Sequence, residues 1–178
     1  MKGIIFNLVE DIVTAEHGED TWDALVDQAG VDGAYTSLGD YPDADLGRLV
    51  AAASAALETP ADDIVRWIGR QAMPIFVQRY PGLFSRHYGT RSFALGLNEV
   101  IHPEVHKLYP GAATPQFAFD TSDPSALGME YRSARQMCSF AEGLLYGAGD
   151  HFGEDLVITQ PRCMKRDDDH CLLVVSHP

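Results

Sequence analysis

The segment Tyr131-Arg132-Ser133-Ala134-Arg135 carries the side chains with the clearest capacity for chemistry. In an extended segment successive side chains point to opposite faces, so Tyr131, Ser133 and Arg135 would share one face. They would then present two hydroxyl groups and a guanidinium fork to the same place. Arginine binds carboxylates through paired, charge-assisted hydrogen bonds, and hydroxyl groups can satisfy the remaining lone pairs. The spacing therefore predicts a receptor for a molecule that carries one or two carboxylates.

A histidine upstream, His102, suggests what that molecule is. It shares a predicted helix face with Leu95 and Val105. A histidine on an apolar face is most often a hydrogen-bonded core residue, but iron in a buried porphyrin needs a neutral imidazole in such a wall. A heme has both an iron and carboxylates, so it would satisfy both features. His106, one turn further on, is a competing ligand, and Pro103 removes a helical hydrogen bond beside His102.

The three cysteines form a second candidate site. Cys163 and Cys171 flank a polar turn, and Cys138 lies on the preceding predicted helix. Three thiolates suit zinc, and a closed site would take a fourth ligand from one of three histidines: His151, His170 and His177. The alternative is three reduced, partly buried thiols. An odd number of cysteines does not make a closed disulfide framework, which favours a reducing, cytoplasmic location.

Composition narrows the classes of function. The chain has 178 residues, of which 46% are hydrophobic and 22% charged, so we expect one globular domain over residues 1–178. The formal net charge of −13 argues against nucleic acid and anionic membranes as partners. No run is long enough to span a membrane, and Met1 to Val13 is typical of a folded helix and not of a signal peptide. No hydrolase motif occurs, so an enzyme is not predicted.

The hydrophobic pattern predicts an α+β fold, with one antiparallel sheet packed against helices. A helical amino-terminal part spans about residues 1–60, and a part that contains the sheet spans about residues 61–178. Within the first part, Asp20 or Thr21 would cap a helix that ends at Gly30. Further predicted helices cover residues 46–57, 61–80 (with Pro74 as a kink), 92–108 and 136–152. Predicted strands cover residues 116–120, 129–135, 156–159 and 171–175.

Taken together, these residues resemble the heme nitric oxide/oxygen binding (H-NOX) domains, which include bacterial gas sensors and the heme region of soluble guanylate cyclase. The resemblance covers essentially the whole chain and centres on the Y-x-S-x-R signature at residues 131–135 with His102 upstream. It extends to Met1-Lys2-Gly3-Ile4-Ile5-Phe6-Asn7, Thr21-Trp22-Asp23, Tyr35-Thr36-Ser37, Arg79-Tyr80-Pro81 and Tyr109-Pro110-Gly111.

The resemblance implies roles for individual residues. His102 would be the axial ligand of a heme b, and Tyr131, Ser133 and Arg135 would hold its propionates. Pro115 would press on the porphyrin, and the heme pocket would be lined by four apolar residues: Ile5, Phe76, Phe140 and Leu144. Relatives that hold dioxygen place a tyrosine at the position of Phe140. Since phenylalanine has no donor, the resemblance implies a sensor that binds nitric oxide and carbon monoxide and excludes oxygen.

The resemblance also implies a switch and a partner. Nitric oxide would break the bond between iron and His102, the heme would relax against Pro115, and the helical part would shift relative to the sheet part. The signal would pass to a separate protein such as a histidine kinase or a cyclic-di-GMP enzyme. Some relatives bind zinc through three cysteines and a histidine three residues before the first hairpin cysteine. Here that position is Gln160, so a zinc-responsive or redox-responsive role for Cys138, Cys163 and Cys171 remains the alternative function.

Overall fold

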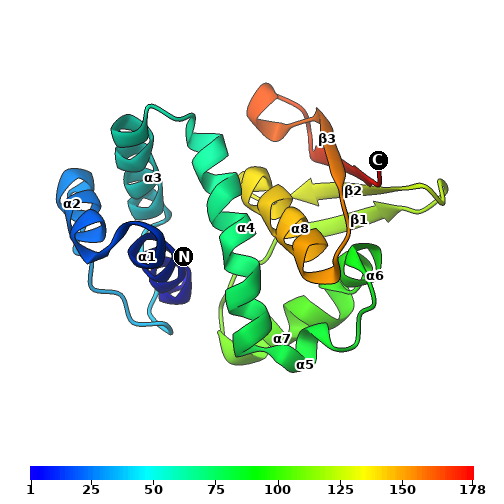
Figure 1. The fold of residues 1–178 in the computed structure, drawn as a ribbon, viewed down its shortest axis with the longest axis horizontal. Helices are drawn as coiled ribbons and strands as arrows, with labels where there is room; N and C mark the ends of the chain where they lie inside the picture. Colours follow the sequence, from blue (N-terminus) through cyan, green and yellow to red (C-terminus); the bar gives the residue numbers. More distant parts are fainter.

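The computed structural model describes residues 1–178 as an α+β fold, as the sequence predicts (Figure 1). Its helices are α1 (Gly3–His17), α2 (Glu19–Ala29), α3 (Asp43–Leu57), α4 (Ala61–Arg79), α5 (Pro81–Phe84), α6 (Thr90–Leu95), α7 (His102–Leu108) and α8 (Cys138–Phe152). Two short turns add to these, the π-helical η1 (Leu97–Ile101) and the 3-10 turn η2 (Met164–Arg166). The strands are β1 (Gln116–Asp120), β2 (Ala126–Arg132), β3 (Val157–Arg162) and β4 (Cys171–Ser176).

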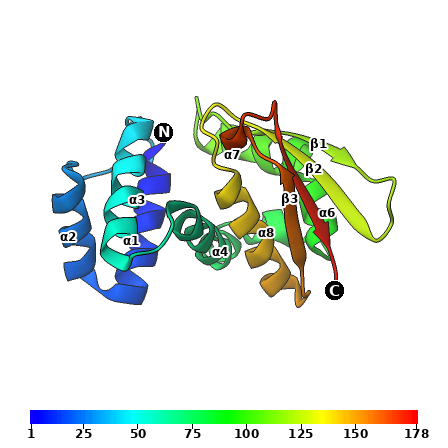
Figure 2. The same ribbon diagram turned by 90° about the horizontal axis from the view of Figure 1, so that it is seen from above.

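The four strands form one antiparallel sheet in the order β1-β2-β4-β3. On β2, Leu127, Met129 and Tyr131 alternate with more exposed residues and are buried, because one face of the sheet packs against helices. Seen from above, α8 and α4 lie between the sheet and the amino-terminal helices α1–α3 (Figure 2). The molecule is thus layered, with the sheet at one end and α1–α3 at the other.

The two central helices, α4 and α8, cross with their backbones very close together. A side chain at Gly143 would overlap the carbonyl oxygen of Arg66, and one at Gly69 would overlap the carbonyl oxygen of Phe140. Glycine is required there because no Cβ fits between the two backbones. Gly147 belongs to the same contact, against Arg70 and Met73. Those glycines serve helix packing.

The predicted helix over residues 92–108 is wrong in detail, since the chain forms three consecutive pieces. α6 ends at Leu95, η1 widens to a π-helical turn, and α7 begins at His102. Gly96 between α6 and η1 has low helix propensity, and Pro103 lies in the first turn of α7, where its missing N–H leaves no helical bond unmade. The proline therefore starts a helix and does not interrupt one.

Three other boundaries differ from the prediction. β2 ends at Arg132 and not at residue 135, because the chain turns there and Gln136 adopts a left-handed φ of 51°. α2 is preceded by Gly18 with no side-chain cap, and the Thr21 hydroxyl instead donates to the carbonyl of His17. α3 begins at Asp43, three residues earlier than predicted. In none of the helices does an apolar run reach the length that a membrane crossing requires.

Candidate functional site

A cavity of about 290 Å³ lies among α1, α4, α7, α8 and the sheet, and 24 of its 30 lining residues are hydrophobic. Every residue that the sequence points to as part of a heme site lines it: His102, Tyr131, Ser133, Arg135, Ile5, Phe76, Pro115, Phe140 and Leu144. These residues come from α1, α4, α7, α8, β2 and the segments next to the strands. The fold thus brings together side chains that are up to 139 positions apart in the chain, from Ile5 to Leu144.

His102 occupies the first position of α7, directly after the π-helical turn. Its imidazole stacks on Phe117 with ring centroids 5.8 Å apart. Burial, together with the nearby His106, lowers the pKa of His102 to about 4. The imidazole is therefore neutral at physiological pH, which is the form that binds a metal.

His106, the competing ligand, does not line the cavity. Its side chain is exposed, and its Nε2 atom lies 3.2 Å from the hydroxyl oxygen of Thr114. Of the two histidines on α7, His102 is the one that faces the apolar cavity.

The signature residues meet at the cavity although the strand ends before two of them. Tyr131 is on β2, and its hydroxyl oxygen accepts a hydrogen bond of 3.0 Å from the backbone N–H of Met137. Ser133 and Arg135 lie in the turn that follows, where the Ser133 hydroxyl accepts from the Arg135 backbone N–H at 3.3 Å. A turn that is closed by its own side chains, and not strand alternation, therefore gathers the hydroxyls and the guanidinium.

The Arg135 guanidinium is held from its outer side. Its Nε donates to the Asp43 carboxylate at 2.8 Å, and its Nη1 donates to the Ala113 carbonyl at 2.8 Å. These bonds leave N–H groups on the fork for a further acceptor. Burial raises the pKa of Tyr131, so its hydroxyl keeps the proton that it can donate. The site can thus offer both a cation and a neutral donor to a carboxylate.

The cavity lining is apolar at the four positions where the resemblance implies that the gas binds. Ile5 comes from α1, Phe76 from α4, and Phe140 and Leu144 lie one turn apart on α8. None of these four side chains has a hydrogen-bond donor. Pro115 lies on the cavity wall immediately before β1.

Two tyrosines to which the sequence analysis assigns no role also line the cavity. Tyr80 follows α4 and Tyr109 follows α7, and their hydroxyl oxygens are 2.6 Å apart. Burial, then the bond to Tyr80, raises the pKa of Tyr109 to about 12, so that hydroxyl stays protonated. The pair links the end of the helix that carries His102 to the end of α4. Tyr80 follows Phe76 by four residues, which is the helical spacing that could have revealed it.

The donor set fits a heme. The cavity offers a neutral imidazole to an iron, an apolar wall to a porphyrin ring, and a guanidinium with hydroxyls to its carboxylates. The polar and apolar parts of the lining correspond to the polar and apolar parts of that one cofactor.

The cysteines form a compact, buried cluster elsewhere. The sulfur atoms of Cys138, Cys163 and Cys171 all lie within 4.8 Å of one another. The shortest separations are 3.8 Å between Cys138 and Cys163 and 4.0 Å between Cys163 and Cys171. Burial raises the pKa of the Cys171 thiol to about 12. The three thiols therefore meet as predicted, while none of the three candidate histidines joins the cluster: His151, His170 and His177.

Comparison with known proteins agrees with this geometry. The fold and site define a heme-binding α+β domain, and the sequence model of the haem-NO-binding family matches residues 2–160. The chain belongs to that family, the H-NOX proteins. No curated protein matches it.

Solved structures of H-NOX proteins superpose over the whole chain. The S. oneidensis H-NOX protein in its Fe(II)NO state is 32% identical, with a TM-score of 0.93 over 100% of this chain and 99% of that one. The same domain in its Fe(II)CO state gives a TM-score of 0.90 at 32% identity, over 100% and 99%. The unliganded Fe(II) protein from K. algicida gives 0.89 at 28% identity, over 100% and 97%.

Proposed function

We propose that the chain is a gas sensor that binds a heme b through His102 and detects nitric oxide. The observation that carries this proposal is the gathering of a neutral imidazole, an arginine fork and two hydroxyls around one apolar cavity. His102 would be the axial ligand, and Tyr131, Ser133 and Arg135 would hold the propionates. When bound, the heme supplies the ferrous iron to which nitric oxide and carbon monoxide attach. The two ligand states of the S. oneidensis relative support both gases.

Oxygen exclusion is part of the proposal and depends on Phe140. Dioxygen on ferrous iron draws negative charge and is retained when a donor stabilises it, whereas nitric oxide binds without such help. Phe140, Ile5, Phe76 and Leu144 supply no donor to the cavity. The protein would then detect dilute nitric oxide in the presence of air.

Signalling would begin at His102, which would hold the iron, and at Pro115, which would contact the porphyrin. Loss of the bond to iron would free His102 and the start of α7, and Pro115 would follow the relaxing porphyrin. Arg135 would carry the movement to the amino-terminal helices, because its ion pair with Asp43 joins the signature turn to the first residue of α3. We propose that residues 1–178 act in this way as a single, non-catalytic sensor domain. Its output would reach a separate enzyme, such as a histidine kinase or a cyclic-di-GMP enzyme.

The visible absorption spectrum of the purified ferrous protein tests the proposal. Measured under nitrogen, then air, then nitric oxide, it should not move in air and should shift to a five-coordinate nitrosyl spectrum with nitric oxide. A stable oxygen complex would contradict the role of Phe140 and direct attention to the hydroxyls of Tyr80 and Tyr109. Absence of a Soret band after reconstitution with heme would contradict the whole proposal.

The cysteine cluster favours a second candidate function, as a zinc-responsive or redox-responsive element. Three buried sulfur atoms within 4.8 Å could hold zinc if a fourth ligand were recruited. Gln160, at the position where some relatives have a histidine, has a buried amide nitrogen without a hydrogen-bond partner. Metal analysis of protein purified without chelators, compared with a Cys163→Ser variant, would decide whether zinc is bound. Equal zinc content in the two proteins would contradict a site at these sulfurs.

A further inference from the structure

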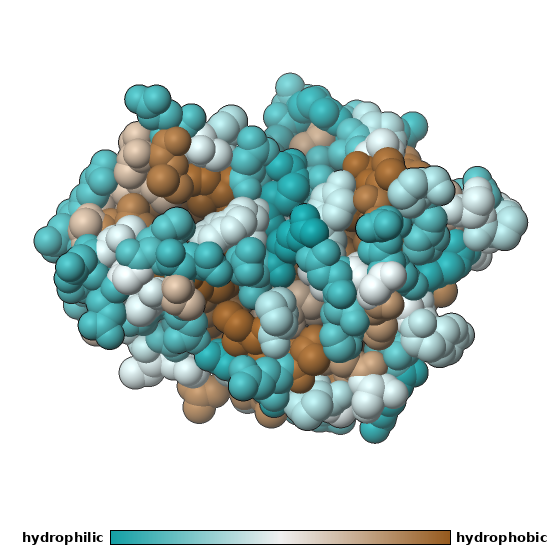
Figure 3. All heavy atoms as spheres, in the orientation of Figure 1, coloured by the Kyte–Doolittle hydropathy of each residue, from teal (hydrophilic) through white to brown (hydrophobic).

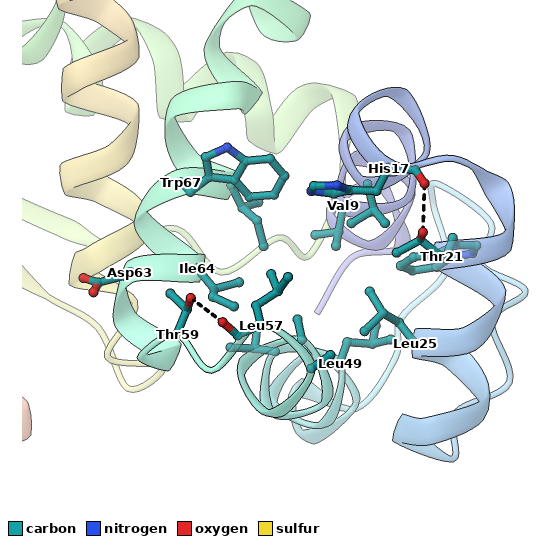
Figure 4. Close-up of a pocket in the computed structure, with 16 residues that line it drawn as sticks. Val9, His17, Thr21, Leu25, Leu49, Leu57, Thr59, Asp63, Ile64 and Trp67 are labelled. Atoms are coloured by element: carbon teal, nitrogen blue, oxygen red, sulfur yellow. Dashed lines mark hydrogen bonds between the residues drawn. The ribbon is translucent and has the colours of Figure 1, made fainter.

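A second cavity, of about 510 Å³, lies among the four helices α1–α4 and is separate from the heme cavity (Figure 4). Twelve of its 16 lining residues are hydrophobic, and they include Val9, Leu25, Leu49, Ile64 and Trp67. Each of these helices contacts the next in the order α1-α2-α3-α4, α4 also contacts α1, and the cavity lies at the centre of the four. We refer to this hollow as the helical groove.

The helical groove opens to the surface where the α1–α2 turn faces the α3–α4 turn. His17 and Thr21 lie on one side of the opening, and Leu57 and Thr59 lie on the other (Figure 4). Leu57 is 58% exposed, which is unusual for a leucine at the edge of a core. The space-filling view shows an apolar area at the upper left, over α3 and the start of α4, with hydrophilic residues around it (Figure 3). An exposed apolar patch with a polar rim is typical of an interaction site.

Charge on the helical part that surrounds the helical groove is mainly negative. Residues 1–60 contain 12 acidic and two basic side chains, whereas residues 61–178 contain 14 acidic and 11 basic ones. The helical part therefore carries a formal charge of −10 out of the total of −13. Exposed acids flank the lining residues of the opening in sequence: Glu16 precedes His17, Asp20 precedes Thr21, and Glu58 follows Leu57. Asp63 also lines the opening and is paired with Arg66.

We propose that the helical groove is the docking site for a basic amphipathic segment of the signalling partner. Bulky apolar side chains of that segment would fill the hollow, and its Lys and Arg side chains would meet the acidic rim. A second copy of this chain is disfavoured, because it would bring its own charge of −10 to the same surface. The inference rests on the proposed function only in assuming a separate partner.

The helical groove and the heme cavity share two helices, α1 and α4, in their walls. Val9 of α1 lines the groove, and Ile5, one turn earlier, lines the heme cavity. On α4, Ile68 lines the groove and Met73 lines the heme cavity. A segment that docks in the groove would therefore contact the same two helices that form a wall of the gas-binding cavity.

Both tryptophans of the chain, Trp22 and Trp67, line the helical groove and provide a direct readout. The purified full chain, labelled with 5-fluorotryptophan, would be titrated with a helical peptide of leucine and lysine and followed by fluorine NMR. We expect both fluorine signals to shift and saturate. The matched peptide with glutamate in place of lysine should leave them unchanged.

Two pairs of variants separate the helical groove from general attraction to an acidic protein. Ala56→Phe fills the opening, whereas Ala55→Phe makes the same change at an exposed neighbour that does not line it. We expect peptide affinity to fall about tenfold in the first variant and to stay unchanged in the second.

The second pair tests the rim. Glu16→Lys with Glu58→Lys reverses charge beside the opening, and Asp27→Lys with Asp32→Lys makes an equal change of net charge away from it. The rim pair should weaken binding more than the distant pair does.

Several results would overturn the docking proposal. Equal binding of the glutamate peptide, equal effects of the two alanine substitutions, or tryptophan signals that do not move would each do so. Toluene, added in a separate titration, serves as a small apolar probe. Tryptophan signals that respond to toluene but to neither peptide would overturn the docking proposal and identify a small-molecule cavity. Signals that depend on protein concentration without peptide would identify a second copy as the occupant. The nitric oxide spectrum of the same samples is measured independently, so failure of docking is distinguishable from failure of gas sensing.

Discussion

His102 lines the cavity at a point where the helical geometry changes on both sides of it. The π-helical turn ends one residue before it, and Pro103 starts α7 one residue after it. A regular helix across residues 97–108 would have placed proline in its interior, at a cost of about 3 kcal/mol. π-helical turns occur often at functional sites. The π-helical turn and the proline are therefore the local features on either side of the candidate ligand.

Replacing His102 tests that assignment against its neighbour. We expect His102→Gly to lose the iron–histidine stretching band of the five-coordinate ferrous protein in the resonance Raman spectrum. His106→Gly should keep it, because His106 lies outside the cavity. The opposite pattern would make His106 the axial ligand.

Phe140→Tyr tests the basis of gas selectivity. A hydroxyl at this position would donate a hydrogen bond to bound dioxygen, which is worth about 1.5–3 kcal/mol, or roughly tenfold to a hundredfold in affinity. We expect the variant to form an oxygen complex in air and the natural protein to form none. Phe140→Leu is the control, since it changes size without adding a donor. If both variants behave alike, the size of the side chain and not its hydroxyl controls oxygen binding.

At the scale of helices and strands, the sequence was most informative where patterns were regular. The periodic apolar residues of α1, α4 and α8 and the β-branched run of β4 predicted elements that the structure contains. The prediction of strand at residues 133–135 is wrong, because the conformation there depends on the bonds from Arg135 to Asp43 and Ala113, which are distant in the sequence. All nine candidate heme residues nevertheless line one cavity. They were selected mainly by the family resemblance, which does not depend on the local conformation of residues 133–135.

The features that sequence reasoning missed are products of packing between distant segments. The pairing of β2 with β4 joins strands separated by α8 and β3, and no local signal specifies it. The helical groove likewise exists only when four helices leave a hollow between them. The glycines of α8 were visible in the sequence, but their purpose depends on the position of α4.

Gly143→Ala tests the close crossing of α4 and α8. The added methyl group would overlap the Arg66 carbonyl, so the helices must separate, and we expect a loss of about 1–3 kcal/mol in the free energy of unfolding. Gly47→Ala on α3 is the matched control, because nothing lies near its added methyl group. That variant should gain about 0.5–1 kcal/mol from better helix propensity. Chemical denaturation followed by circular dichroism measures the free energy of unfolding of both variants. An unchanged value for Gly143→Ala would mean that the two helices have room for a methyl group at their crossing.

At the scale of the whole molecule, the ion pair between Arg135 and Asp43 joins the sheet part to the amino-terminal helices. The hydrogen bond from Arg135, then that from the amino group of Met1, lowers the pKa of Asp43 below its ordinary value of 3.8. The carboxylate therefore stabilises the folded state above that value, and the stabilisation is lost as the pH falls through the lowered pKa. Because both side chains are partly exposed, the expected contribution is about 0.5–1 kcal/mol.

Asp43→Asn should remove this contribution to stability and its dependence on pH. The variant should be less stable than the natural protein at pH 7, and the difference should shrink as the pH falls below the ordinary carboxyl range. Asp32→Asn, an exposed carboxylate without an ion pair, is the control and should show little difference at any pH. Denaturation midpoints across the acid range give the comparison, and a difference that does not vary with pH would rule out the ionic contact as its source.

The uneven distribution of charge has a consequence for how the molecule meets other proteins. With most of the negative charge on residues 1–60, the protein has an electric dipole along its long axis, and α1–α3 form its negative end. A positively charged surface would attract that end first, so encounters would be oriented before any contact forms. Salt at physiological concentration screens such fields beyond about 8 Å, so the rate of association would fall as ionic strength rises while dissociation changes less.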